Sequence, residues 1–102
     1  MNRDDEPEPV ALPITGELDL HAFAPRDVAS VALEYLQACR ERDILLVRLV
    51  HGRGKGVQRA EVRRVLDGLP WVEMFHDAAP SSGGWGATIV RLKPRNEREA
   101  SE

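Results

Sequence analysis

Hydrophobic and polar residues along the first half of the chain follow the periods of a strand, a helix and a second strand. Over residues 15–21 every second residue near the centre is apolar, which is typical of a short, half-buried strand. Residues 24–43 carry apolar side chains in a single stripe at helical spacing and predict an amphipathic helix. Residues 44–50 are nearly continuously apolar, which predicts a strand covered on both faces.

The second half of the chain repeats this alternation and ends in two strands. Residues 57–68 predict a second amphipathic helix, and residues 71–77 alternate again with the period of a strand. A loop rich in glycine and serine at 80–86 then leads to a last strand at 87–92.

The predicted order β-α-β-α-β-β indicates a compact two-layer α/β sandwich with a mixed four-stranded sheet. Strands that are joined through helices run parallel, with right-handed crossovers. The first three strands should therefore end at one edge of the sheet, whereas the fourth, which follows a short loop, should return antiparallel. Ligands usually bind at the edge formed by the carboxyl ends of parallel strands, so we expect the functional residues there.

The length of 102 residues is enough for one small domain, which we expect at residues 13–93. Residues 1–12 predict a disordered acidic arm, and residues 94–102 predict a charged flexible tail. No secretory signal and no apolar run long enough for a membrane span is evident, so we expect a cytoplasmic protein without a membrane partner. Cys39 is the only cysteine, which excludes an internal disulfide and a cysteine-based zinc site; inert packing is expected.

Charge is distributed unevenly along the chain, although the formal net charge is only −3. Residues 1–17 hold one cation against five acids, a net of −4. Residues 48–64 hold six cations against one acid, a net of +5. The acidic arm therefore masks a basic patch that could bind a polyanion.

The basic patch surrounds a glycine-rich turn between a predicted strand and a predicted helix, "VHGRGKG" at 50–56. Glycines at alternate positions permit positive φ and close approach of a ligand, and the helix directs free N–H groups at an anion. The spacing matches neither a nucleotide P-loop nor G-x-G-x-x-G, and a row of cations suits a nucleic-acid backbone better than a small nucleotide. The alternative is a tight turn with solvated cations. The residues expected to bind nucleic acid here are Gly52, Arg53, Gly54, Lys55, Arg59 and Arg63.

Three polar residues at predicted strand ends could supply acid–base chemistry. Asp19 and His21 lie two residues apart on a predicted strand and should point to the same side, and His51 follows the second long strand. One imidazole could activate a nucleophile and the other could protonate a leaving oxygen, while the carboxylate orients an imidazole. The alternatives are structural: a carboxylate that accepts backbone N–H bonds and a histidine that is only a polar strand end.

The remaining histidine and the loop before the last strand complete the predicted edge. His76 is in phase with the apolar Val72 and Met74, so we expect a histidine packed in the core. The loop places Gly83, Gly84 and Trp85 at the same edge, where an exposed indole could stack on a base. The alternative for the indole is a ring folded over the core.

Together these motifs resemble the Smr (small MutS-related) domain family. The matching pieces are "LDLH" at 18–21, "VHGRGKG" at 50–56 and "GGWGATIVRL" at 83–92, in the family's order over residues 15–93. The family usually carries glycine after the "LDLH" histidine, where this chain has Ala22. We therefore expect the approach of substrate to this turn to differ.

The resemblance implies a fold similar to the C-terminal domain of translation initiation factor three. It also implies binding of structured DNA or RNA, with cleavage by several members assisted by a divalent metal, Mg or Mn, and action by some on RNA held by ribosomes. The metal ligands are unknown, although Asp19 could contribute, and no organic cofactor is expected. The family's functional motifs map here to Asp19, His21, His51, Gly52, Arg53 and Gly54.

The sequence pattern and the resemblance together lead to three hypotheses for function. The first is a structure-selective DNA or RNA endonuclease that nicks phosphodiesters in DNA repair, recombination or RNA and ribosome quality control. The second is a nucleic-acid- or ribosome-binding module without catalysis, and the third, much weaker, is a binder of nucleotide phosphates. A monomer is favoured, and the sequence does not distinguish DNA from RNA.

Overall fold

The computed structural model describes residues 14–52 and 56–95, and within them the predicted order of strands and helices is confirmed. The strands and helices are β1 (Glu17–Asp19), α1 (Val28–Glu41), β2 (Leu46–Val50), α2 (Val57–Asp67), β3 (Val72–Asp77) and β4 (Ala87–Leu92). Short 3-10 turns lie at Leu20–Ala22, Pro25–Asp27, Pro80–Ser82 and Gly84–Gly86. The predicted arm, the predicted tail beyond residue 95 and the tip of the glycine-rich turn lie outside the described residues.

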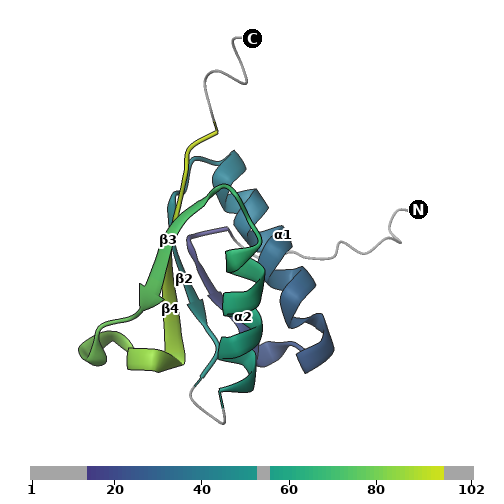
Figure 1. Cartoon of the computed structure of the whole chain (residues 1–102), viewed down its shortest axis with the longest axis vertical. Helices are drawn as coiled ribbons and strands as arrows, with labels where there is room; N and C mark the ends of the chain where they lie inside the picture. The colour runs from purple at the N-terminus through teal and green to yellow at the C-terminus, as the bar shows by residue number, and fades with distance from the viewer. Residues whose placement is uncertain (1–13, 53–55, 96–102) are drawn as a thin grey trace.

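The four strands form one mixed sheet in the order β1-β2-β4-β3. β1 and β2 pair in parallel, and β4 pairs antiparallel with both β2 and β3. The first three strands therefore run in the same direction and the fourth returns between two of them, as the central arrows in Figure 1 show. The prediction of a mixed sheet with an antiparallel last strand is confirmed.

Both helices lie on the same face of the sheet (Figure 1). The chain moves across the sheet in one direction, from β1 to β2 and on to β3, so two right-handed crossovers place α1 and α2 on one side. Val47 and Leu49 of β2 are buried beneath the helices, whereas Leu46 is 57% exposed on the opposite face. The expectation that this strand is covered on both faces is therefore wrong.

The core fills the space between the helices and the covered face of the sheet. Its members are apolar residues with almost no exposure: Leu18, Leu20, Val28, Leu36, Cys39, Val47, Leu49, Val62, Leu66, Val90 and Leu92. Burial raises the pKa of the Cys39 thiol, which keeps it protonated and agrees with the expected packing role. Among the described residues, no helix is long and apolar enough to cross a membrane.

The phase of β3 differs from the prediction because the pairing of β3 with β4 is irregular between Val72 and Met74. A bulge adds one residue to a strand and moves the side chains beyond it to the opposite face. Phe75 consequently packs against the core, while Met74 is 48% exposed and His76 is exposed. The expectation of a core histidine at position 76 is wrong.

The phase of β3 predicts the relative cost of two truncations. Phe75→Ala should lower the free energy of unfolding by about 2 kcal/mol or more, because its ring packs on the core. Met74→Ala should change it by no more than about 0.5 kcal/mol, because the side chain faces solvent. Urea unfolding of both variants measures the difference, and the reverse ranking would contradict the observed register.

Candidate functional site

Segments that are distant in the sequence meet at the carboxyl edge of the three parallel strands. The backbone N–H groups of His51 and Gly52, which follow β2, donate to the carbonyl of Gly86 over 3.0 and 2.8 Å. The loop before β4 is therefore bound directly to the glycine-rich turn. The predicted convergence of the "HGRG" and "GGWG" motifs is confirmed for the described residues.

Asp19 and His21 form a polar pair at the end of β1. The carboxylate oxygen Oδ1 of Asp19 accepts the backbone N–H of His21 at 2.9 Å and faces Nδ1 of the same imidazole at 2.9 Å. The strand ends at Asp19, so a 3-10 turn capped by the carboxylate, and not strand alternation, brings the two side chains together. Both side chains are more than half exposed.

The hydrogen bonds of the pair favour an ionised Asp19 and one tautomer of His21. The backbone hydrogen bond from His21 is the main cause that lowers the pKa of Asp19, so the carboxylate is ionised at neutral pH. An ionised carboxylate beside Nδ1 favours the tautomer in which that nitrogen carries the proton. Nε2, the other ring nitrogen, then presents a lone pair.

Gly52 provides the surface on which the ring of His21 rests. Its φ of +80° lies in the left-handed region, and a Cβ at this position would lie 2.3 Å from Nε2 of His21. Only glycine permits both the backbone conformation and the close approach. The imidazole of His21 is therefore fixed against the start of the glycine-rich turn.

His51 adopts a different position from the one predicted for a catalytic base. Its side chain is 4% exposed, with Nε2 2.8 Å from Oγ1 of Thr88 and Nδ1 3.1 Å from the carbonyl oxygen of Gly52. With the proton on Nδ1 donated to that carbonyl, Nε2 accepts the Thr88 hydroxyl, and desolvation lowers the pKa of the imidazole. The geometry favours a neutral histidine that joins the end of β2 to β4.

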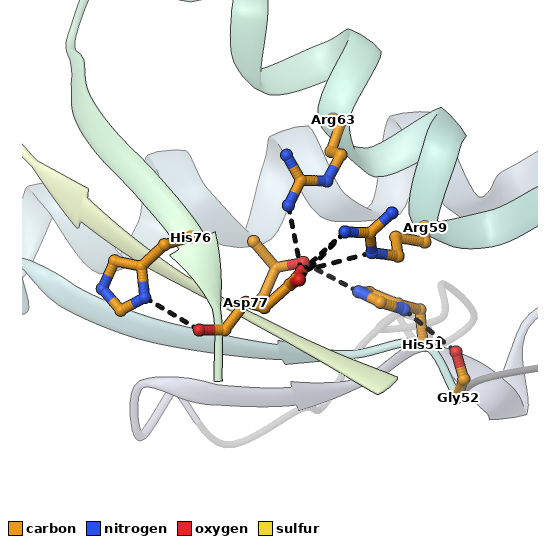
Figure 2. A network of polar contacts seen from close by, with 7 residues as sticks. His51, Gly52, Arg59, Arg63, His76 and Asp77 are labelled. Atoms are coloured by element: carbon orange, nitrogen blue, oxygen red, sulfur yellow. Dashed lines mark hydrogen bonds and ion pairs between the residues drawn. The ribbon is translucent and has the colours of Figure 1, made fainter. Parts of the chain in front are cut away.

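Asp77, at the end of β3, binds two arginines of α2. Oδ1 of Asp77 accepts bonds from Nη2 of Arg59 and Nη2 of Arg63, both at 2.9 Å, and Oδ2 accepts a second bond from Arg59 at 3.0 Å (Figure 2). These hydrogen bonds, first from Arg59 and then from Arg63, lower the pKa of Asp77. The two arginines expected to form part of a free cationic row are thus paired with a carboxylate.

Two residues of this site, Thr88 and Asp77, were not predicted from the sequence, for different reasons. Thr88 shares its strand face with the buried Val90 and Leu92, so a polar residue in an apolar phase was an available signal. In the alternation of residues 71–77, Asp77 falls opposite the apolar Val72 and Met74, because the bulge in β3 has no signature in the sequence. Its place at the end of a parallel strand was the remaining hint.

The other predicted site residues are described only in part. Gly83 and Gly84 both have positive φ, and a Cβ on Gly83 would lie 3.0 Å from the guanidinium of Arg48. Arg48 also donates to Glu17 over 2.8 Å, on the face of the sheet opposite the helices. Arg53, Gly54 and Lys55 lie outside the described residues, as does the side chain of Trp85.

The donor groups at this edge do not fit a metal site made of protein ligands alone. Among residues 14–52 and 56–95, no group of three or more His, Cys, Asp or Glu side chains could hold a metal ion. The exposed carboxylate of Asp19 could offer one ligand, but His21 already occupies its Oδ1 atom. A dependence on Mg or Mn therefore stays a prediction from the resemblance.

The contact between Gly52 and His21 predicts the effect of a single added methyl group. Gly52→Ala should displace the imidazole and lower the free energy of unfolding by about 1–3 kcal/mol, because a non-glycine residue is strained at this φ. Gly68→Ala is the matched control, since its φ is negative and the nearest atom lies 3.6 Å away. Imidazole NMR signals of His21 should move in the first variant only; an unmoved ring would contradict the contact.

Burial of His51 predicts a pH dependence of stability. Its pKa is lower in the folded protein than in the unfolded chain, so the unfolded chain binds the proton first as pH falls below about 6.5. Wild type should therefore lose stability between pH 8 and pH 5 relative to His51→Gln. His21 and His76 are present in both proteins and cancel in the comparison. Urea unfolding across this range is the measurement, and parallel pH profiles would contradict a buried neutral imidazole.

Comparison with known protein sequences gives consistent matches. The family model described as "Smr domain" matches residues 18–93. The endonuclease MutS2 of Thermus thermophilus is 41% identical over 81 residues, which is 76% of this chain and 10% of that protein. The ribosome rescue factor SmrB of Erwinia tasmaniensis is 30% identical over 76 residues, which is 74% of this chain and 42% of that protein. The chain thus spans less than half the length of these relatives.

Solved structures agree with these sequence matches. The crystal structure of the Smr domain of Thermus thermophilus MutS2 has a TM-score of 0.74 and 34% identity, and the match covers 78% of this chain and all of that one (100%). YdaL, a stand-alone small MutS-related protein from Escherichia coli, has a TM-score of 0.71 over 76% of this chain and 64% of that one. At 24% identity, YdaL supports the fold alone. The family model covers most of this chain, including its "LDLH" and "HGRG" segments, so this chain belongs to the Smr domain family.

Proposed function

We propose that this Smr domain binds DNA or RNA along the carboxyl edge of its sheet and hydrolyses a phosphodiester there. The observation that carries the proposal is the exposed Asp19–His21 pair, whose imidazole lies against the Gly52 turn. A solvent-accessible base held by a carboxylate, beside a turn suited to an anion, is the arrangement that phosphodiester hydrolysis needs. Action in the cytoplasm remains part of the same proposal.

In this proposal His21 performs the proton transfers. Nδ1 keeps its proton and donates a hydrogen bond to Asp19, so Nε2 is available to take a proton from a water molecule that attacks phosphorus. The bond between phosphorus and the leaving oxygen breaks, and the imidazolium returns the proton to that oxygen. The ionised Asp19 stabilises the imidazolium during the interval, as carboxylates do for catalytic histidines.

Positive potential at the same edge supports phosphate binding. α2 begins directly after Gly56, whose φ is +78°, and the N–H groups of its first turn face the edge without a side-chain cap. Arg59 and Arg63 follow on the helix face that borders the site. Such groups stabilise the additional negative charge of a pentacoordinate phosphorus in the transition state.

His51 acts in this proposal as a positioning residue. Its buried, neutral ring bonds to Thr88 and to the carbonyl of Gly52, and so it holds the turn on which His21 rests. It does not need to reach substrate. This assignment replaces the earlier expectation that His51 itself transfers a proton.

The relatives support nucleic acid as the substrate class and leave its kind open. MutS2 is named as an endonuclease and SmrB as a ribosome rescue factor. We therefore include structured DNA, structured RNA and ribosome-bound RNA in the proposal. Assistance by Mg or Mn is added from the resemblance to the family alone.

A second candidate is a binding module without catalysis. Burial of His51 favours it, because it removes one of the two imidazoles expected to share acid–base work. The Asp19–His21 pair would then only contribute to recognition of the phosphate backbone.

Cleavage by purified variants separates the two candidates. Supercoiled plasmid and a structured RNA are incubated with Mg²⁺, Mn²⁺ or EDTA at saturating protein. His21→Ala should lower the cleavage rate by roughly 100- to 10,000-fold, the usual contribution of a positioned acid or base, while affinity changes little. His76→Ala is the matched control, because it removes an exposed histidine from the opposite face of the sheet.

The control also guards against a contaminating nuclease. Equal cleavage by wild type and both variants would assign the activity to a contaminant or to other residues and would favour the binding module. Binding without cleavage by wild type in every metal would likewise leave the binding module as the function. Loss of cleavage in His76→Ala alone would mean that the histidines are assigned wrongly.

A further inference from the structure

The cluster of Arg59, Arg63 and Asp77 is an unusual use of cations at a site that should bind phosphate. Both guanidinium groups are directed at a single carboxylate, and they share its Oδ1 atom. Carboxylate and phosphate oxygens offer guanidinium groups the same two-oxygen geometry. The carboxylate therefore occupies a position that a phosphate could take.

The cluster lies next to the glycine-rich turn. Asp77 is opposite Thr88 in the ladder between β3 and β4, and the hydroxyl of Thr88 bonds to His51 at 2.8 Å. Arg59 belongs to the first turn of α2, shortly after Gly56. Figure 2 shows Arg63 above Asp77 and Arg59 to its right, with His51 below Arg59.

The cluster is accessible to a ligand. The side chains of Arg59, Arg63 and Asp77 are 30%, 32% and 38% exposed. Ion pairs at this degree of exposure are weak and exchange readily with competing ions, whereas a fully buried pair would be fixed. A phosphate could reach these three side chains without unfolding the domain.

The two arginines are not held equally. Arg59 binds both carboxylate oxygens, through Nε and Nη2. Arg63 donates one bond to Asp77, and its guanidinium lies 5.2 Å from the centre of the Phe75 ring. Its buried Nε has no acceptor in the described part of the chain. Arg63 is therefore held to the carboxylate by fewer bonds than Arg59.

We propose that Asp77 is an internal stand-in for phosphate, which occupies Arg59 and Arg63 in the free protein and yields them to a backbone phosphate of the bound nucleic acid. The proposal rests on the proposed nucleic-acid binding and adds a residue that sets its strength. Asp77 lowers the affinity for polyanions in general and keeps the two guanidinium groups oriented until a phosphate replaces the carboxylate. A phosphate that binds weakly, or one that is not part of a chain of phosphates, competes poorly with the Asp77 carboxylate for the two guanidinium groups.

Asp77→Asn tests the proposal, because asparagine keeps the shape of the side chain and removes its charge. Its affinity for a structured RNA and for inorganic polyphosphate should rise by about 3- to 10-fold, the gain expected when two partly exposed ion pairs no longer compete. Glu61→Gln on α2 is the matched control: it changes the net charge of the protein by the same amount as Asp77→Asn and releases Arg64, which pairs with Glu61. Its effect should stay below about 2-fold.

A double-mutant cycle assigns the gain to the cluster. In the Arg59→Gln/Arg63→Gln background, Asp77→Asn should have no more effect than Glu61→Gln, because no cation is left to release. An equal gain in both backgrounds, equal gains for Asp77→Asn and Glu61→Gln, or weaker binding by folded Asp77→Asn would each overturn the proposal. Thermal unfolding checks that the variants are folded.

Wild-type protein gives a second measurement that needs no variant. The NMR signal of the Arg59 Nε–H group, which donates to Asp77 over 3.2 Å, should shift on titration with inorganic tripolyphosphate. An unmoved signal at saturation would overturn the proposal. If wild type binds no nucleic acid, the proposed function fails by itself; polyphosphate binding gained by Asp77→Asn would still support the stand-in, and its absence would refute it.

Discussion

A buried hydroxyl on the central strand needs a hydrogen-bond partner, and His51 provides it. Thr88 of β4 has no exposed surface, and it lies between Leu49 of β2 and Asp77 of β3 in the two ladders. An unpaired hydroxyl in such a place would cost roughly 1–3 kcal/mol. The hydroxyl donates to Nε2 of His51, and this bond also fixes where the chain leaves β2.

The position of His51 determines the geometry of the adjoining turn. The backbone N–H groups of His51 and Gly52 bind Gly86, so the loop before β4 and the turn after β2 form one unit. Gly52 then presents a surface without a side chain to the ring of His21. The buried imidazole of His51 therefore supports the exposed imidazole of His21 indirectly, through the backbone of Gly52.

Charge at this edge is more balanced than the run of cations suggests. Asp77 binds two arginines, and Asp19 lies beside His21, so two carboxylates accompany the groups that should meet phosphate. Unpaired guanidinium groups would attract any polyanion. Paired with carboxylates, the same groups favour ligands whose phosphates lie where the carboxylate oxygens now are.

The sequence by itself determined the order of elements, the parallel direction of the first three strands and the edge at which "LDLH", "HGRG" and "GGWG" meet. These follow from local periodicity and from the handedness of crossovers, which depend on short stretches of chain. The tertiary structure decided the rest. The insertion of β4 beside β2, the bulge that turns Phe75 inward and His76 outward, the burial of His51 against Thr88 and the capture of Arg59 and Arg63 by Asp77 all depend on pairing between strands that are remote in the sequence. Periodicity gives the phase of a strand only until a bulge shifts it, and a charge count does not reveal which carboxylate a fold will place beside a cation.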